Sequence, residues 1–442
     1  MGTTWYNSIK ITEDIMSISA KELTAFQKRI EEANRKWLKD NKVEEKIERI
    51  RWGSSLEDPR LISTGNPALD WALGGGIQEG TIFELYGAPG AGKTTAMCYI
   101  MAEVQKLGKY VIYYHLEEAA KPSKAWKLAG VDENKVVYIN ALKSGEDGLN
   151  LIRELLVDDK GIPTDVVGMI VMDSISALAP AAEVTSVDGN GMEGTTMARQ
   201  AALTSKMFRI MTGTGWLSKG CLTGLVNQER AQIGQTPLPN LTSGGKSIPY
   251  YAKVRVQLKQ PSDKFLVENE GVVTEGKQDS TGKKLTIGHT IDYYISKNNT
   301  GSAPPFRRGS WRVIYEKGID YLGPIIEEAI TYGIIEQIGR SRFIVKWISE
   351  NTIKKSDSIH GRAALIKYIE SNSPEVQNGI QDAISKVRAY TSETSVDFVD
   401  GLAYINGTEA DILELIIQSV KENIITEVED ELIPDMRGDS EQ

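Results

Sequence analysis

The segment from Gly87 to Thr94 constrains this chain most, because it reads GAPGAGKT and matches the pattern G-x-x-x-x-G-K-[ST]. It directly follows the apolar run TIFELY and opens a stretch with helical periodicity. In that setting glycines let backbone N–H groups surround a polyphosphate, and the helix N-terminus adds a favourable dipole. We expect Lys93 to reach the outer phosphates and the Thr94 hydroxyl to bind Mg²⁺. The expected nucleotide contacts are Gly87, Ala88, Pro89, Gly90, Ala91, Gly92, Lys93, Thr94 and Thr95, with Asp173 opposite them.

Two carboxylates end apolar strand patterns and are expected beside the phosphates. Asp173 ends GMIVMD and suits a second position directed at Mg²⁺. Glu117 ends YVIYYHLE, and a carboxylate at the C-terminal end of such a strand points into the ligand crevice. There it can polarise an attacking water as general base. Either acid alone can be a surface cap, but two of them near one phosphate loop favour a catalytic site.

Short apolar runs alternate with helical patterns from Leu61 onward, which predicts an α/β fold. We expect a mostly parallel sheet with helices on both faces, and its buried strands are predicted at 81–87, 110–116, 135–140, 168–174 and 221–227. More strictly alternating runs predict an antiparallel extension at 252–259, 290–297 and 310–317. The segment between 261 and 288 is rich in glycine and charge and is interpreted as a hairpin or a flexible insert.

Helical patterns flank this core on both sides. Near the start, Leu23, Phe26, Ile30 and Trp37 form the apolar stripe of an amphipathic helix, which packs on its own chain or on a neighbouring copy. The region after about 323 predicts a small α-rich C-terminal domain. The acidic end, ITEVEDELIPDMRGDSEQ, is expected to be a solubilising or regulatory tail. The expected limits are 1–52 for the helical arm, 53–322 for the core, 323–426 for the C-terminal domain and 427–442 for the tail.

Composition excludes several classes of protein. With 40% hydrophobic and 25% charged residues, the chain is not expected to be disordered as a whole. The net charge of -9 argues against a generally basic coat for nucleic acid, although a local basic surface remains possible. No apolar run is long enough for a bilayer, so no membrane partner is expected. Cys98 and Cys221 lie in apolar surroundings, which favours buried thiols in a reducing cytoplasm over a disulfide.

The run NQERAQIGQTPLPNLTSGGK, from Asn227 to Lys246, follows a strand-like pattern but has neither helical nor strand periodicity of its own. It contains two prolines and three glycines. A structureless loop of that length inside a compact domain is uncommon and is usually functional. We therefore expect this segment to hold a ligand.

Several motifs together resemble the RecA family of homologous-recombination ATPases. They are LISTGNPALDWALGGGIQEG, GAPGAGKTT, MIVMDSISALAPAAEV, NQERAQIG, TSGGK, YYAKVRV and PPFRRGSWRVIYEKGIDYLG, and they occur in the family's order. The resemblance extends roughly from Arg51 to Tyr390. It implies a RecA-type P-loop core and a DNA-dependent ATPase that uses ATP and Mg²⁺ in recombination and repair. It also implies a helical homo-oligomeric filament on single-stranded DNA, which pairs that strand with a homologous duplex.

The resemblance also implies catalytic roles. Lys93 keeps its phosphate role, Glu117 resembles the family's water-activating glutamate, and Asn227 and Gln228 resemble the pair that senses the γ-phosphate. Lys297 resembles one of the lysines that reach the phosphates of a neighbouring subunit. A nucleotide-dependent shift of Gln228 would order or release the segment that follows it.

Two segments resemble the DNA-binding loops of the family, Val184 to Thr196 the first and Glu229 to Ser243 the second. Polar groups there can hold phosphates, apolar side chains can wedge between bases, and glycines permit close backbone approach. The residues assigned to DNA in this way are Met192, Arg199, Arg230, Ile233, Gly244, Gly245 and Lys246.

The chain departs from the family's pattern at several positions. The second lysine of the neighbouring subunit is Asn299 here, and Arg307 or Arg308 is a candidate substitute. The Asp-Pro-x-Tyr segment that holds adenine is KPSK here, so no aromatic side chain stands at Lys124. After about Tyr390 the chain continues beyond the resemblance, and this part is expected to add a helical element.

Two rival functions share the phosphate loop. A RecA-fold ring helicase has the same Lys93, Glu117 and Asp173, but the segments NQERAQIG and PPFRRGSW favour a recombinase. A mediator that binds ATP and hydrolyses it poorly is disfavoured by the intact Glu117 and Gln228. The substitutions at 124 and 299 leave room for that second rival.

Overall fold

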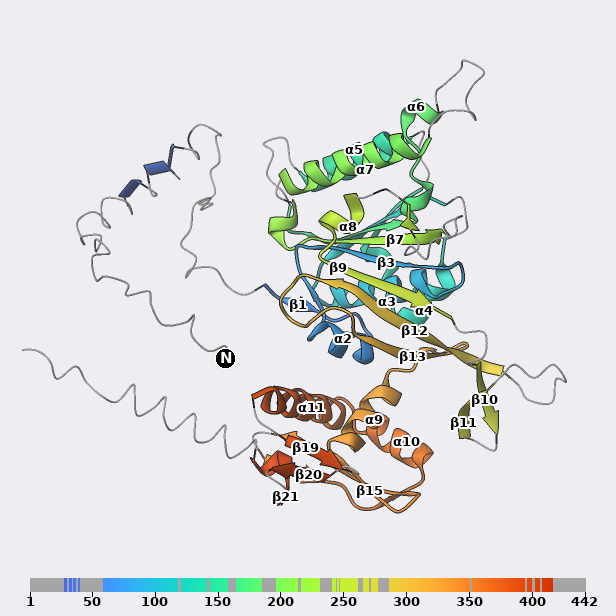
Figure 1. The fold of residues 1–442 in the computed structure, drawn as a ribbon, viewed down its shortest axis with the longest axis vertical. Helices are drawn as coiled ribbons and strands as arrows, with labels where there is room; N and C mark the ends of the chain where they lie inside the picture. The colour runs from blue at the N-terminus through green and yellow to red at the C-terminus, as the bar shows by residue number, and fades with distance from the viewer. Residues whose placement is uncertain are drawn as a thin grey trace, which may run out of the picture.

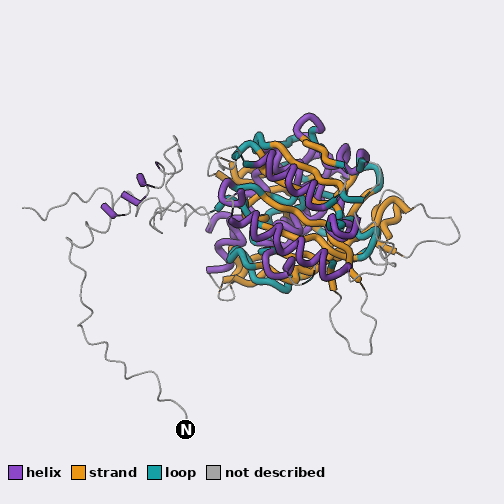
Figure 2. Tube along the Cα trace, turned by 90° about the horizontal axis from the view of Figure 1, so that it is seen from above, coloured by secondary structure: helices purple, strands orange, loops and turns teal. Residues whose placement is uncertain are grey.

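The computed structural model describes residues 59–117, 121–140, 144–157, 164–184, 196–213, 216–230, 241–243, 245, 247–260, 265–269, 272–276, 286–349, 352–393, 396–399, 402–405 and 408–415, and a few residues between 28 and 39. A mixed sheet with helices on both faces forms the larger unit, and a smaller unit follows it in the chain (Figures 1 and 2). The predicted α/β fold is therefore confirmed.

The large sheet contains a path of nine strands in the order β11-β10-β12-β9-β3-β7-β6-β4-β5. Its parallel strands are β3 (Ile82–Gly87), β4 (Tyr110–His115), β5 (Val136–Ile139), β6 (Val167–Asp173), β7 (Leu222–Arg230) and β9 (Val254–Lys259). All five strands predicted from the sequence are present, although β5, at the edge of the sheet, is only partly buried. The expectation of an antiparallel strand at 252–259 is wrong on one side, because β9 pairs in parallel with β3 and antiparallel only with β12.

Antiparallel strands complete the sheet beyond β9. They are β10 (Phe265–Asn269), β11 (Val272–Gly276), β12 (Thr286–Asn298), β13 (Arg308–Ile314) and β14 (Gly318–Ile319), and β8 (Leu241–Thr242) pairs antiparallel with the end of β7. The β10–β11 pair confirms a hairpin inside the insert at 261–288. A separate pair, β1 (Leu61–Ile62) and β2 (Ile77–Gln78), precedes the phosphate loop.

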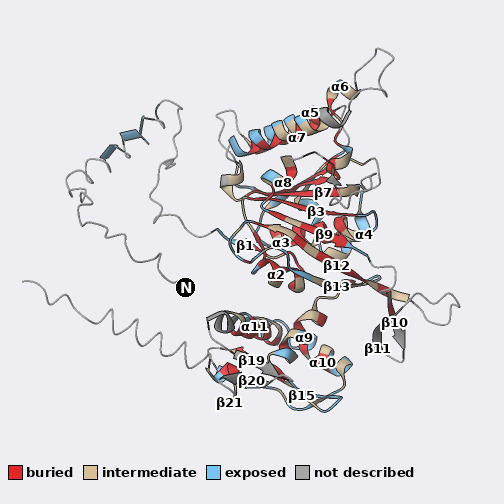
Figure 3. Cartoon of the chain, in the orientation of Figure 1, coloured by how far each residue is buried: buried red, intermediate tan, exposed pale blue. Residues whose placement is uncertain are grey.

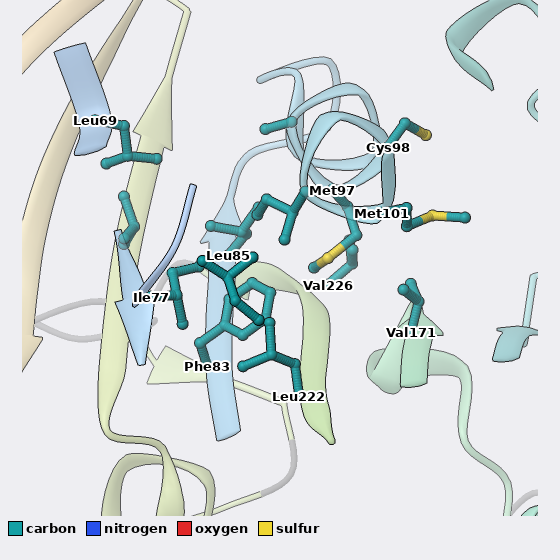
Figure 4. Packing of buried hydrophobic residues seen from close by; sticks show 14 of the residues in the cluster. Leu69, Ile77, Phe83, Leu85, Met97, Cys98, Met101, Val171, Leu222 and Val226 are labelled. Carbon is teal, nitrogen blue, oxygen red and sulfur yellow. The ribbon is translucent and has the colours of Figure 1, made fainter. Parts of the chain in front are cut away.

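Alternate residues of the parallel strands pack on opposite faces of the sheet. Phe83 and Leu85 of β3 pack against α3 (Lys93–Lys106) on one face (Figure 4), whose core also includes residues of α2 (Pro67–Leu73) and α4 (Ser123–Ala129). Ile82 belongs to the core on the other face, which contains residues of α5 (Gly145–Leu156), α7 (Thr196–Gly213) and α8 (Ser247–Tyr251). The short α6 (Ala181–Val184) and three 3-10 turns, Glu133–Lys135, Ile175–Ala177 and Trp216–Lys219, complete this part. The central strands β3 and β6 are largely apolar because both of their faces are buried (Figure 3).

The smaller unit has a hydrophobic core of its own. Its helices are α9 (Leu322–Thr331), α10 (Arg362–Ser371) and α11 (Glu375–Glu393), which confirms that the C-terminal region is helical. A sheet that the sequence analysis did not predict packs with them: β15 (Ile335–Ile338), β16 (Arg342–Ser349), β17 (Thr352–Lys355) and β18 (Ile359–His360). The helical element expected after 390 is wrong over its first part, where β19 (Val396–Val399), β20 (Leu402–Ile405) and β21 (Thr408–Ala410) form a meander.

The two ends of the chain are described only in part. Between 28 and 39 the described residues are helical and exposed, as the polar face of the predicted helix should be. The apolar stripe and the acidic tail at 427–442 lie outside the described residues. Within the described part, no helix is long and apolar enough to cross a membrane.

Candidate functional site

The phosphate loop joins the end of β3 to the start of α3, and its glycines are required by their surroundings. A Cβ on Gly87 would lie 2.1 Å from the carbonyl oxygen of Leu258, and a Cβ on Gly92 would lie 2.5 Å from Ile291. Gly90 and Gly92 also have φ angles of 79° and 78°, a region that favours glycine. The neighbouring strands β9 and β12 therefore leave space only for a bare backbone, as an anion-binding loop requires.

Lys93, the first residue of α3, is almost fully buried with its ammonium group against the loop. Its Nζ donates to the carbonyl oxygens of Gly87 at 3.0 Å and Ala88 at 2.8 Å. Burial lowers the pKa of Lys93, while the carboxylates of Asp173 and Glu117 oppose that change. The lysine is thus held at the loop by weak neutral acceptors, which anionic phosphate oxygens can replace with stronger charge-assisted bonds.

Thr94 and Asp173 meet on the C-terminal side of the loop, although they are far apart in the sequence. Thr94 Oγ1 donates to Asp173 Oδ2 at 2.9 Å, and Tyr113 Oη donates to the same oxygen at 2.6 Å. Burial raises the pKa of Asp173, and these two hydrogen bonds oppose the change. A hydroxyl and a carboxylate are hard oxygen ligands, so this pair fits Mg²⁺ brought in with a nucleotide.

Glu117 and Gln228, which the sequence analysis assigned to separate roles, are in direct contact. Gln228 Nε2 donates to Glu117 Oε1 at 3.1 Å, which joins the ends of β4 and β7 across β6. Both side chains are partly accessible to solvent. The candidate base and the candidate γ-phosphate sensor are therefore in direct contact at the same edge of the sheet as the phosphate loop.

A buried polar network lies next to this contact and holds the stem of the loop that follows β7. Asn227 Nδ2 donates to Glu84 Oε1 at 2.7 Å and to the Ser243 carbonyl oxygen at 3.0 Å. Glu84, fully buried in β3, accepts from Arg255 Nε at 2.5 Å, and Arg255 also donates to Thr242 Oγ1 at 3.2 Å. We call these five residues the stem network; they connect β3, β7, β8 and β9.

The predicted structureless loop is shorter than the sequence suggested. Strand β7 continues to Arg230, and its last two residues pair with β8 at Leu241 and Thr242. Gln257 Nε2 of β9 also donates to Glu229 Oε1 at 2.6 Å. Both ends of the segment 231–240 are therefore anchored in the sheet.

The residues assigned to DNA are described only in part. Arg199 is exposed on α7 and donates to the Ala182 carbonyl oxygen at 3.3 Å. Gly245 is exposed and has a φ angle of 68°. Arg230 is placed by its backbone in β7. The assignments that lie outside the described residues are Met192, Ile233, Gly244 and Lys246.

The lysine that matches the family's pattern, Lys297, has partners in its own chain, and so do the side chains connected with the departures from that pattern. Lys297 Nζ donates to the carbonyl oxygens of Pro249 at 2.7 Å and Tyr250 at 3.2 Å. Lys124 forms an exposed ion pair with Glu316 at 2.5 Å. The two arginines proposed as substitutes for the missing lysine contact an aromatic residue of their own chain: Arg307 donates to the Trp71 carbonyl oxygen, and Arg308 lies over the Tyr294 ring.

Comparison with known proteins agrees with this geometry. The family described as RecA N-terminal domain matches residues 47–320, more than half of the chain. The chain belongs to the RecA family. Protein RecA of Chlorobaculum tepidum is 31% identical over 342 residues, which are 77% of this chain and 88% of that protein. Protein RecA of Chlorobium chlorochromatii is 33% identical over 329 residues, covering 74% and 82% of the two chains. Protein RecA of Trichormus variabilis is 32% identical over 358 residues, covering 80% and 87%.

RecA family members are ATPases, so membership implies that this chain binds a nucleotide. Several residues of the site were not found by sequence reasoning, notably Tyr113, Glu84 and Arg255. Glu84 carried a signal that went unused, because a carboxylate inside the apolar run TIFELY must find a buried partner. Arg255 had no such signal, since an arginine in an alternating strand is usually exposed to solvent.

Proposed function

We propose that this chain is an ATP-dependent DNA strand-exchange recombinase. In this proposal it polymerises on single-stranded DNA, pairs that strand with a homologous duplex, and hydrolyses ATP in response to DNA. The helical arm at 1–52 makes contacts between protomers, the core at 53–322 carries both ligands, and the regions 323–426 and 427–442 form a C-terminal domain and an acidic tail. Family membership and the arrangement of the phosphate loop support this proposal.

The residues of the site have complementary tasks in ATP hydrolysis. Backbone N–H groups of the phosphate loop and Lys93 hold the phosphates, and Glu117 accepts a proton from the attacking water. Thr94 and Asp173 would hold Mg²⁺, which would supply positive charge beside the phosphate oxygens. Lys297 is expected to reach the phosphates of the neighbouring subunit after exchanging its two backbone acceptors for them.

One observation carries the proposed coupling between ATP and DNA, namely the position of Gln228 and Asn227 side by side in β7. Gln228 contacts Glu117, and Asn227 holds the Ser243 carbonyl at the far end of the segment 231–240. A shift of Gln228 toward a γ-phosphate therefore acts on a strand that also anchors the DNA-binding segment. This is a local switch of the kind that a terminal phosphate orders and its loss releases.

The central experiment compares ATP turnover with and without single-stranded DNA. Wild-type protein should show turnover that depends on DNA, and Glu117→Gln should reduce it by about 10²-fold or more while nucleotide and DNA binding persist. Glu370→Gln, an exposed carboxylate on α10, is the matched control and should behave as wild type. Near-normal hydrolysis by Glu117→Gln would remove Glu117 as the base.

A second experiment tests where DNA binds. Replacing only residues 231–240 with a Gly-Ser linker leaves β7, β8 and the stem network in place. ATP binding should survive, and stimulation by DNA should be lost; unchanged stimulation would place DNA elsewhere. Electron microscopy with ATP and single-stranded DNA separates the rivals, since a closed ring indicates a helicase and the absence of any filament favours a mediator.

A further inference from the structure

Tyr113 is a buried tyrosine whose hydroxyl reaches the candidate metal site. The residue lies in β4 with none of its surface exposed, and its Oη donates to Asp173 Oδ2 at 2.6 Å. Thr94 donates to the same carboxylate oxygen at 2.9 Å. Among the described residues, no hydrogen-bond donor contacts the other oxygen, Oδ1. Hydrogen bonds therefore fix one oxygen of the carboxylate, Oδ2, and leave Oδ1 available to a ligand.

An aromatic cluster fixes the position of the Tyr113 ring. Tyr138 stacks on it with a centroid distance of 6.0 Å and an interplanar angle of 6°, and Trp126 meets it edge-on at 5.5 Å. Tyr138 is fixed in turn by a hydrogen bond of 2.6 Å between its hydroxyl and His115 Nδ1. Since the ring is packed on neighbouring strands and α4, the hydroxyl cannot leave Asp173 without disturbing the core.

We propose that Tyr113 is a positioning residue for the divalent cation that accompanies the nucleotide. It holds Oδ2 of Asp173, so that Oδ1 is the oxygen presented toward the cation. Thr94 can offer a lone pair to the cation while its proton stays on Oδ2. Hydrogen-bonding partners of this kind orient ligands and affect metal affinity almost as strongly as the ligands themselves. This inference rests on the proposed function, because it assumes a metal-bound nucleotide.

Core packing alone does not account for the hydroxyl. A phenylalanine would fill the same space beside Tyr138 and Trp126, and a buried hydroxyl is costly unless it is hydrogen-bonded. Its partner here is a carboxylate, which makes the bond charge-assisted and shorter than a neutral one. The hydroxyl therefore has a role that involves Asp173, and removing it tests that role without emptying the core.

The test uses Mn²⁺ as the probe, ADP as the nucleotide and the full-length protein. Electron paramagnetic resonance of free Mn²⁺ gives its affinity for the ADP complex, and a fluorescent ADP in EDTA gives the metal-free nucleotide affinity. Tyr113→Phe should weaken Mn²⁺ binding about tenfold and leave the metal-free affinity unchanged. Tyr114→Phe is the matched control, since Tyr114 is equally buried but belongs to the core on the opposite face of the sheet.

One further variant, Tyr138→Phe, and the wild type make the result decisive. Tyr138→Phe removes a hydroxyl from the aromatic cluster but leaves the Tyr113 bond, so its Mn²⁺ affinity should match wild type. Equal Mn²⁺ affinity in Tyr113→Phe and wild type would overturn the inference, as would an equal loss in Tyr138→Phe. If the wild type bound neither ADP nor Mn²⁺–ADP, the proposed function itself would fail, which is a different result.

Discussion

Two loops carry the proposed chemistry, and they are held in different ways. The phosphate loop is held by backbone: glycines lie against Leu258 and Ile291, and Lys93 bonds to carbonyls of the loop itself. The ends of the segment 231–240 are held by the pairing of β7 with β8 and also by the polar side chains of the stem network, which join four strands. Both loops rely on residues far apart in the sequence, since Gly87 lies against Leu258 and Glu84 bonds to Arg255. They differ in that the first is packed against its neighbours through bare backbone and the second depends on polar side chains.

This difference matters for how each loop can respond to a ligand. A loop fixed by backbone packing is rigid and presents its N–H groups in one arrangement, which suits the binding of a constant triphosphate. A stem fixed by hydrogen bonds between side chains of different strands responds when one of those strands moves, because hydrogen bonds weaken as their distances and angles are distorted. Backbone packing thus gives the phosphate loop a fixed shape, whereas side-chain hydrogen bonds let the segment 231–240 respond to its neighbours.

The largest expected effect is on the backbone-held loop. Gly87→Ala places a Cβ 2.1 Å from a backbone oxygen of β9, which cannot move without breaking the sheet. We expect the free energy of unfolding to fall by about 5 kcal/mol and nucleotide binding to be lost, as measured by chemical denaturation and fluorescent ADP. Gly108→Ala is the control, because it has a φ angle of 79° but nothing within 4 Å. Retained ADP binding by Gly87→Ala would show that the loop is not rigid.

The next effect is on the side-chain-held stem. Glu84→Gln removes the charge that faces Arg255 inside the protein, so the free energy of unfolding should fall by about 4 kcal/mol. Unlike Gly87→Ala, Glu84→Gln should keep its nucleotide affinity but lose the stimulation of ATP turnover by DNA. Loss of both together would end the distinction between the two loops.

A double variant sharpens the result for the stem. In Glu84→Gln with Arg255→Gln no unpaired charge remains buried, so much of the stability should return. Stimulation by DNA should stay low, because Thr242 loses its bond from Arg255. Recovery of stimulation together with stability would mean that the network supports only folding.

The same contrast explains what the sequence could predict. The phosphate loop was predicted residue by residue because its geometry is encoded locally, by glycines between a strand and a helix. The position of Glu117 at the ligand edge of the sheet could be predicted because it ends a parallel strand, but its bond to Gln228 was not predicted. The stem network and the bond from Tyr113 to Asp173 depend on strand order and register, which no local pattern contains. The small sheet at 335–360 was missed because three of its strands have four residues or fewer and lie between stronger helical patterns, although the eight-residue β16 does carry the alternation typical of a strand.

The variant Asp70→Asn separates a change in stability from changes in either loop. Asp70 of α2 is partly buried and accepts hydrogen bonds from Ser63 and Thr64, yet desolvation raises its pKa to about 6 from 3.8. Because the folded pKa is the higher one, the folded state binds more protons between these values and stability falls as pH rises from 4 to 6. This group contributes about 3 kcal/mol to that fall. In chemical denaturation at several pH values, the free energy of unfolding of Asp70→Asn should lack this fall, while nucleotide binding and stimulation by DNA stay unchanged. Identical pH profiles for Asp70→Asn and wild type would show that Asp70 does not cause the fall.

The smallest effect concerns the nucleotide end of the sheet, where the family's aromatic residue is replaced by Lys124. The ion pair of Lys124 with Glu316 is exposed on both sides, so Lys124→Tyr should change stability by less than about 0.5 kcal/mol. If the base lies beside this position, an added ring should strengthen ATP binding by about fivefold through stacking. Lys127→Tyr is the control, because Lys127 lies on α4 one turn after Lys124; it should leave ATP affinity unchanged. If Lys124→Tyr binds ATP more tightly than wild type but binds inorganic triphosphate equally well, then nucleotide affinity comes from two separable contacts. These are the rigid phosphate loop and a weak contact with the base. Equal ATP affinities in Lys124→Tyr and wild type would mean that the phosphate loop alone sets nucleotide binding in this chain.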